Sequence, residues 1–405
     1  MIYVGIDWSD THHDFCILDE SGKKLDSFVV SHGQDGFELA HKHIAKHASA
    51  DQARVAIETK DSLLVDFFNE LGYTLHFLNP KQTDRFRDRH RMSRSKSDSF
   101  DAYVLADAVR TDLHLFNVLS PLDEESLRLR VLTRTREGLV RRKVAVSNEI
   151  TTYLKRYFPV ALDLFGGIDN LEAISFLMQY PTYEQARSVS EIRIASILSK
   201  GAGVSKAIAL RHSQHVREKL QQLQPLAAAS IIRSYPLAIK SLLRQLRAII
   251  DEIARLDNDI RESYNDHPNK DLIGSIPGVA ETLGPVIAAE IGADMTRFHN
   301  IKILKAYCGS SPVTVQSGKY RSIRFRRACN EHIRRALHLA SQSAIRTAAW
   351  ARQLYDRNRA EGKSYGRALR AVADQLLEML YVMLIKRTPY DEAYHLKMKE
   401  LHGHP

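Results

Sequence analysis

The sequence contains little cysteine, and its few cysteines are far apart. Cys16, Cys308 and Cys329 are the only three among 405 residues, and none forms a CxxC pair. This spacing argues against a disulfide framework and against a cysteine-rich zinc site. No run reaches the roughly 18 apolar residues of a membrane span, and the N-terminus does not have the pattern of a signal peptide. We therefore expect a reducing, cytoplasmic compartment and no membrane partner.

Positive charge is in excess. Lysine and arginine number 58, aspartate and glutamate number 48, and the formal net charge is +10. Such a surplus favours polyanionic partners, because contacts with phosphates release counterions. The length predicts two or three domains, at roughly 100–200 residues for each.

The first 115 residues alternate between strand and helix patterns. Asp19 to Gly22 form a hairpin signal between two strands. Strands are expected over 2–6, 13–18, 25–30, 54–57 and 74–78, and helices over 37–48, 63–71 and 98–110. A hairpin followed by strand, helix and strand predicts an α/β domain of the RNase H-like (RuvC-like) class.

Four carboxylates fall where such a fold could gather them. Asp7 and Glu58 each end a short apolar strand, and Asp98 and Asp101 share one face of the predicted helix. Oxygen ligands of this kind suit Mg²⁺, which can assist phosphodiester chemistry. The alternative interpretation is structural, since aspartate is common after strands and in the first turn of helices.

Residues 116–268 are predicted to be mainly helical, and 269–400 to form a mainly α C-terminal domain. Apolar residues from Ile239 to Ile260 repeat at spacings of three and four, which predicts a coiled-coil seam. Its partner could be the helix over 123–157 or the same helix of another subunit. Ile276, Pro277 and Gly278 lie between helical stretches and resemble a helix–hairpin–helix turn that binds DNA phosphate.

Two basic tracts are candidates for binding nucleic-acid backbones. The first comprises Lys81, Arg85, Arg87, Arg89, Arg91, Arg94 and Lys96. The second comprises Lys319, Arg321, Arg324, Arg326, Arg327, Arg334 and Arg335.

Several of these motifs resemble those of a known family. The runs GIDW at 5–8, AIE at 56–58 and KSDSFDA at 96–102 resemble the DEDD motif set of bacterial insertion-sequence transposases, which are related to Piv-type DNA invertases. In the second half, CGSSPVTVQSG at 308–318 resembles the family's serine signature, which matches Ser317 and Gly318. The resemblance covers about residues 1–160 and 270–390.

The resemblance implies a bacterial, Mg²⁺-dependent recombinase. Asp7, Glu58, Asp98 and Asp101 would bind the metal, and Ser317 would attack the DNA backbone to form a phosphoserine link. Ser310 and Ser311 remain open as alternatives to Ser317. Family members act as oligomers, here a dimer or tetramer, and use a structured noncoding RNA to choose element ends and target DNA.

Two other functions remain open. A RuvC-like, structure-selective endonuclease would use the carboxylates to activate water and would give Ser317 no role. A non-catalytic nucleic-acid-binding protein would use the carboxylates only structurally.

Overall fold

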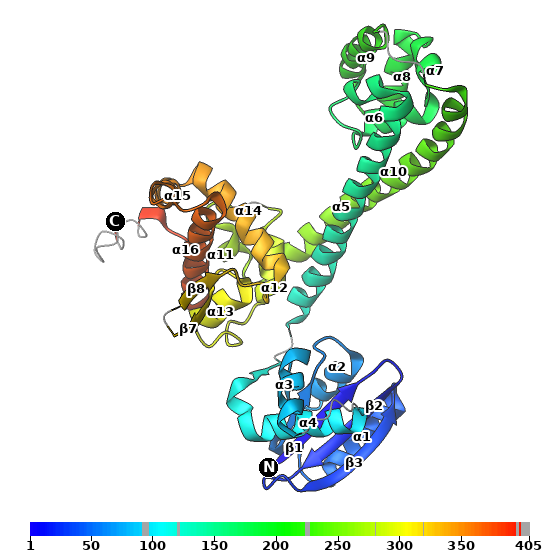
Figure 1. Ribbon diagram of the computed structural model, residues 1–405. Coiled ribbons are helices and arrows are strands. Elements are labelled where there is room, and N and C mark those ends of the chain that lie inside the picture. Colours follow the sequence, from blue (N-terminus) through cyan, green and yellow to red (C-terminus); the bar gives the residue numbers. More distant parts are fainter. Residues whose placement is uncertain are drawn as a thin grey trace. The chain divides into compact units, whose positions relative to one another are not determined.

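A computed structural model describes residues 1–90, 97–119, 122–222, 227–279, 281–318, 320–393 and 397 (Figure 1). The chain divides into two compact units, residues 1–122 and 123–405. Among the described residues, no helix combines the length and apolar character needed to cross a membrane.

The N-terminal unit is built on a six-stranded mixed sheet. Its strands are β1 (Ile2–Trp8), β2 (His12–Leu18), β3 (Lys24–Ser31), β4 (Ala53–Ile57), β5 (Thr74–Phe77) and β6 (Asn117–Val118). The order across the sheet is β3-β2-β1-β4-β5-β6. β1, β4 and β5 are parallel, and the other neighbouring pairs are antiparallel. This arrangement fits the RNase H-like domain that the sequence predicts.

Helices cover both faces of this sheet (Figure 1). α1 (Gln34–Ala45) and α2 (Leu63–Glu70) pack on one face in a core that includes Val4, Ile6 and Phe15. α4 (Asp98–Asp112) covers the other face, where Ala102 and Ala106 contact Cys16 and Leu18. α3 (Pro80–His90) packs beside α4. Short 3₁₀ turns occupy 50–52 and 113–115.

Gly5 permits the close approach of α4 to β1. A Cβ atom at Gly5 would overlap the carbonyl oxygen of Ala102 and would lie 2.5 Å from the Ala106 nitrogen. Two backbones can meet this closely only where one residue has no side chain. Gly5 therefore allows the α4 backbone at Ala102 and Ala106 to lie directly against β1.

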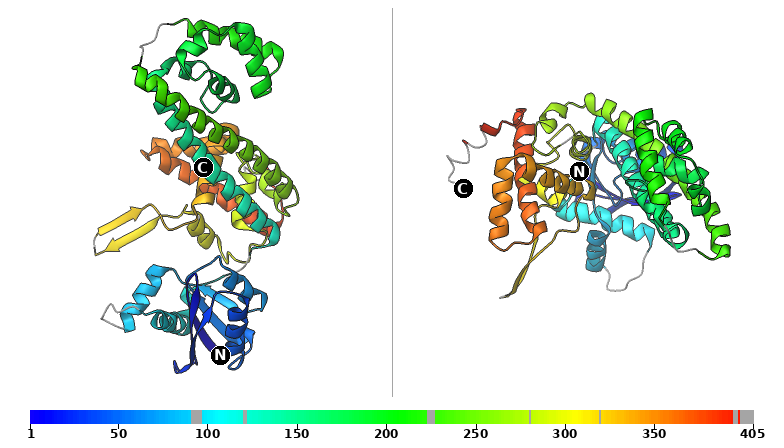
Figure 2. Two further views of the ribbon diagram at one scale, coloured as in Figure 1. Left: turned by 90° about the vertical axis from the view of Figure 1, so that its right-hand side faces the viewer. Right: turned by 90° about the horizontal axis from the view of Figure 1, so that it is seen from above.

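The C-terminal unit is organised by two long helices, α5 (Glu124–Tyr157) and α10 (Ala229–Asn265), which lie side by side (Figures 1 and 2). One lobe contains α6 (Leu171–Gln179), α7 (Tyr183–Arg187), α8 (Glu191–Ala202) and α9 (Lys206–Leu220), with a 3₁₀ turn at 159–163. The other contains α11 (Lys270–Gly274), α12 (Gly284–Ile291), α13 (Ile301–Cys308), β7 (Val313–Ser317), β8 (Tyr320–Arg324), α14 (Glu331–Thr347), α15 (Ala349–Ala360) and α16 (Tyr365–Lys386).

The predicted seam of α10 is used within the chain. Ile239 and Leu246 pack in the core of the first lobe, and Leu256 and Ile260 in the core of the second. α5 is the helix against which α10 packs most extensively. The seam therefore joins two hydrophobic cores, and pairing of α10 between subunits stays a prediction.

A buried ionic network anchors the second lobe to α5. The fully buried Glu290 of α12 accepts hydrogen bonds from Arg134 of α5 at 2.8 and 2.9 Å. It also accepts one from Asn330, the residue that caps α14. These partners lower the pKa of Glu290 against the opposing effect of its burial, so the carboxylate is held in its charged form.

Candidate functional sites

Two adjacent strand ends bring Asp7 and Glu58 together. β1 and β4 are parallel, and their last paired residues are Ile6 and Ile57. Asp7 and Glu58 each follow that pair by one residue, and both are half-buried. Because side chains alternate along a strand, Asp7 projects from the same face as Gly5, which is the face that α4 covers.

Asp98, the first residue of α4, forms a group of three potential metal ligands with two residues of β2. Ligand atoms of His12, Asp14 and Asp98 all lie within 4.8 Å of one another. Asp98 and His12 are exposed, whereas Asp14 is only 8% exposed. No other such group of three occurs in the described parts of the chain.

Asp14 is a member of this group that the sequence alone did not single out. It is the cross-strand partner of Asp7, so both side chains lie on one face of the sheet. Burial raises the pKa of Asp14, the Asp98 carboxylate raises it further, and His12 opposes them. A divalent cation would offset the cost of burying the Asp14 carboxylate and would reduce its repulsion by Asp98.

Asp101, the fourth predicted carboxylate, already has a cationic partner. It is 3% exposed, and Arg87 Nε donates a hydrogen bond to Asp101 Oδ1 at 2.7 Å. Arg87 also forms an ion pair with Asp84. Arg87 was predicted to bind nucleic acid, but in this structure its charge is engaged within the unit.

The rest of the first basic tract is partly exposed. Lys81, Arg85 and Arg89 lie on the exposed surface of α3, and Arg89 lies 3.5 Å from Asp112. Arg91, Arg94 and Lys96 fall outside the described residues. The described cations nevertheless leave α3 with a basic surface.

Ser317 lies at the end of a two-stranded hairpin. β7 and β8 are antiparallel, and Ser317 pairs with Tyr320 across the turn. Gly318 has φ 54, a conformation that favours glycine. Ser317 is exposed at this end of the hairpin.

The alternative serines lie at the base of the same hairpin. Ser310 Oγ donates a hydrogen bond to Asp374 Oδ1 at 2.9 Å. Asp374 in turn accepts one from Lys305 at 2.6 Å. The Ser311 carbonyl accepts a hydrogen bond from Arg326 Nε at 3.1 Å. Ser310 is therefore tied to a carboxylate, unlike Ser317 at the hairpin end.

The second basic tract divides into exposed and engaged arginines. Arg321, Arg324 and Arg327 are exposed. Arg334 lies 3.1 Å from Glu331, and Arg335 lies 2.9 Å from Glu137. Lys319 falls outside the described residues.

Gly278, the centre of the predicted DNA-binding turn, has a packing role. Its φ is 82, and a Cβ there would lie 2.6 Å from the Ala344 nitrogen of α14 and would overlap the Ala340 carbonyl. The turn therefore packs closely against α14. A role for Gly278 in binding phosphate stays a prediction.

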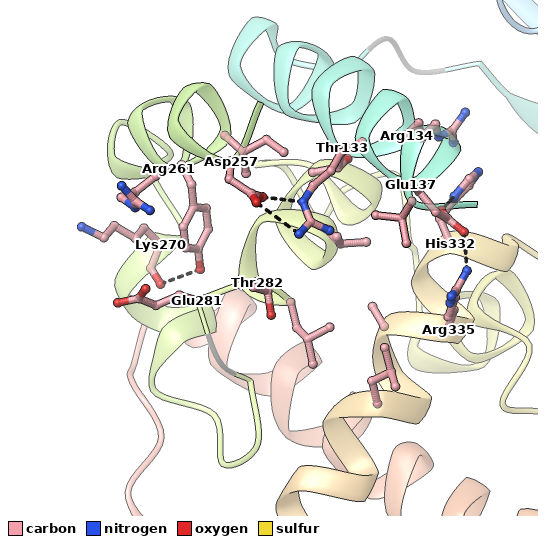
Figure 3. A pocket seen from close by; sticks show the side chains of 18 of the residues that line it. Thr133, Arg134, Glu137, Asp257, Arg261, Lys270, Glu281, Thr282, His332 and Arg335 are labelled. Carbon is pink, nitrogen blue, oxygen red and sulfur yellow. Dashed lines mark hydrogen bonds and ion pairs between the residues drawn. The ribbon is translucent and has the colours of Figure 1, made fainter. Parts of the chain in front are cut away.

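A cavity of about 580 Å³ lies between α5, α10 and α14 (Figure 3). Some of its charged residues are paired with one another. Arg136 is bound to Asp257, and Glu137 accepts from both His332 and Arg335. These pairs neutralise part of the charge that lines the cavity.

Comparisons with known proteins match both halves of the chain. Residues 4–159 match a family model described as a transposase, and residues 270–356 match one described as the transposase IS116/IS110/IS902 family. The mini-circle putative transposase for IS117 of Streptomyces coelicolor is 30% identical over 404 residues, which cover 96% of this chain and 95% of the relative. The IS900 uncharacterized 42 kDa protein of Mycobacterium paratuberculosis is 25% identical, over 97% of this chain and 98% of the relative.

Proposed function

Because the chain belongs to the IS116/IS110/IS902 family of transposases, we propose that it cuts and rejoins insertion-sequence DNA with a serine nucleophile and a carboxylate-bound divalent ion. The observation that carries this proposal is that Asp14, Asp98 and His12 have ligand atoms within 4.8 Å of one another, beside the strand ends of β1 and β4 that carry Asp7 and Glu58.

In this proposal Asp7, Glu58, Asp98 and Asp101 hold Mg²⁺. Their donor set is rich in carboxylate oxygen, which is the ligand type that Mg²⁺ prefers. When bound, the ion would supply positive charge that stabilises developing charge on phosphate oxygens. The buried Asp14 supports this assignment, since its carboxylate lies beside Asp98.

Ser317 is the proposed nucleophile. Its Oγ attacks the phosphorus of a DNA phosphodiester and gives its proton to solvent or a nearby base. The bond from phosphorus to one sugar oxygen breaks, and that oxygen takes up a proton from solvent or from the protonated base. The products are a free DNA hydroxyl and a phosphoserine ester. A hydroxyl of a second strand then attacks that phosphorus and displaces Ser317. Arg321, Arg324 and Arg327 are exposed beside this hairpin and could hold the phosphate oxygens.

The proposed partners are element and target DNA, a structured noncoding guide RNA and further copies of the chain. The guide RNA and the oligomer come from the family resemblance. The exposed cations of α3 are compatible with backbone contacts that do not read bases.

The test is Mg²⁺-dependent cleavage of DNA that carries the element's junction, in the presence of RNA transcribed from its flank. We expect Asp98→Asn and Ser317→Ala each to lower cleavage at least 100-fold. Matched controls are Asp51→Asn, an exposed aspartate of the same unit, and Ser322→Ala, a serine of the same hairpin. Normal cutting by Ser317→Ala would favour the endonuclease with water as nucleophile. Binding without cutting on any DNA would favour the non-catalytic alternative.

A further inference from the structure

A second cavity in the C-terminal unit is lined by cations. It has a volume of about 390 Å³ and lies between the base of the β7–β8 hairpin and the N-terminal part of α16. Five basic side chains line it, and no carboxylate does. They are Arg324, Arg326, Lys363, Arg367 and Arg370.

Three of these arginines are not neutralised. Lys363 pairs with Glu361, and Arg326 donates to the Ser311 carbonyl. Among the described residues, no side-chain hydrogen bond or ion pair engages the guanidinium groups of Arg324, Arg367 or Arg370. In the cavity of Figure 3, by contrast, Arg136 is paired with Asp257 and Arg335 with Glu137.

The structure keeps two of these cations together at a cost. Burial lowers the pKa of Arg370, and the Arg367 guanidinium lowers it further. Arg370 lies over the ring of Phe325 at 5.1 Å, and Arg334 lies over the same ring at 5.2 Å. The Phe325 ring thus holds the Arg370 guanidinium near that of Arg367, and these two cations repel each other unless an anion lies between them.

We propose that this cavity binds a phosphodiester of a nucleic-acid strand. Guanidinium groups match phosphate oxygens in geometry and charge, and a phosphate would relieve the repulsion between Arg367 and Arg370. The Ser310 hydroxyl on the cavity wall is held by Asp374, so the arginines are the groups left to bind the anion.

The site adds residues to the nucleic-acid surface that the sequence predicts. Arg324 and Arg326 belong to the second basic tract, whereas Lys363, Arg367 and Arg370 come from the α15–α16 region. The proposal rests on the proposed function only in taking nucleic acid as the ligand, and it needs neither the metal nor Ser317.

The test is equilibrium binding of labelled single-stranded 20-mers, one DNA and one RNA of the same sequence, to the full chain in EDTA. EDTA removes the divalent ions that the proposed cleavage requires. The binding result therefore does not depend on whether the cleavage proposal is correct. We expect Arg367→Gln/Arg370→Gln to weaken binding about tenfold and to flatten the dependence of log affinity on log salt by about one unit. A matched control is Arg193→Gln/Arg211→Gln, which removes the same charge from exposed positions of the α6–α9 lobe.

Two further variants guard against misfolding. Arg367→Lys/Arg370→Lys keeps the charge and should retain the salt dependence, and Arg367→Gln alone changes only an exposed side chain. Weaker binding of the DNA, of the RNA or of both supports the site and shows which nucleic acid it binds. Unchanged affinity and salt dependence for both strands in a folded Gln/Gln variant would overturn it. Labelled polyglutamate serves as a polyanion without phosphate. A variant that binds polyglutamate more weakly but binds both nucleic acids normally would also overturn the proposal.

Discussion

Arg87 Nε lies 2.7 Å from Asp101 Oδ1, and this contact links basic helix α3 to the helix that carries Asp98. The Asp101 side chain is 4% exposed and that of Arg87 is 21% exposed. A candidate metal ligand is therefore neutralised by a residue that the sequence placed on a nucleic-acid surface.

Removing only one partner should leave a buried, unpaired charge. We expect Arg87→Gln to destabilise the N-terminal unit by about 3 kcal/mol, and Arg87→Gln/Asp101→Asn to cost less. Arg89→Gln, which breaks a looser surface pair with Asp112, should cost under about 1 kcal/mol. Denaturant unfolding of the wild type and these three variants checks this. A double variant at least as destabilised as Arg87→Gln would contradict the cost assigned to the unpaired Asp101 carboxylate.

Replacing glycine by alanine should have opposite effects on stability at Gly5, which is closely packed, and at Gly138, which is not. Gly5→Ala should push α4 away from β1 and destabilise the unit by about 2–3 kcal/mol. Gly138→Ala, in the interior of α5 with open space around it, should stabilise its helix by up to about 1 kcal/mol. Hydrogen exchange of β1 and α5 peptides measures both, and a neutral Gly5→Ala would contradict the packing described for α4.

Divalent metal should stabilise the N-terminal unit through Asp14 and Asp98. At a Mg²⁺ concentration 100 times its Kd, the gain should be about 2.7 kcal/mol, and EDTA should remove it. Asp14→Asn removes one of two repelling carboxylates, so we expect higher stability without metal and a smaller response to it. Thermal unfolding with and without Mg²⁺ separates these effects. An undiminished Mg²⁺ response in Asp14→Asn would exclude that residue from the site.

His76 should make the N-terminal unit sensitive to acid. Burial, aided by the positive charge of Arg54, lowers the pKa of His76 to about 4 from 6.5. Between pH 6.5 and about 4, His76 is protonated in the unfolded chain but stays neutral in the folded chain. The free energy of unfolding therefore decreases as the pH is lowered through this range, by about 3 kcal/mol at most. Hydrogen exchange of β5 at pH 7 and 4.5 measures the loss. His76→Leu should reduce this loss, whereas His114→Leu, at an exposed site, should not.

Local patterns predicted most of the N-terminal elements. The strands before Asp7 and Glu58 and the hairpin at 19–22 are present, and α4 begins at Asp98 as expected. α3 was not predicted, because a run dense in arginine shows no apolar periodicity. α10 begins at Ala229 and contains Pro236, so the apolar repeat from Ile239 to Ile260 marks only part of this helix.

The site was harder to predict because it depends on packing between distant elements. Asp14 lies within an apolar strand, and only its alternation with His12 and Cys16 indicates a shared face. That α4 starts above this face follows from the contact at Gly5, which no local pattern contains. Arg367 and Arg370 lie on an ordinary helix, and only the folded hairpin base gives them a cavity.

The most direct measurement is mass spectrometry of the protein after reaction with junction DNA, RNA from the element's flank and Mg²⁺. We expect a nucleotide remnant on the peptide that contains Ser317, absent from Ser317→Ala and from Asp98→Asn. An adduct on Ser310 or Ser311 would move the nucleophile to the base of the hairpin. Cleaved DNA with no adduct on any serine would contradict the proposed serine chemistry.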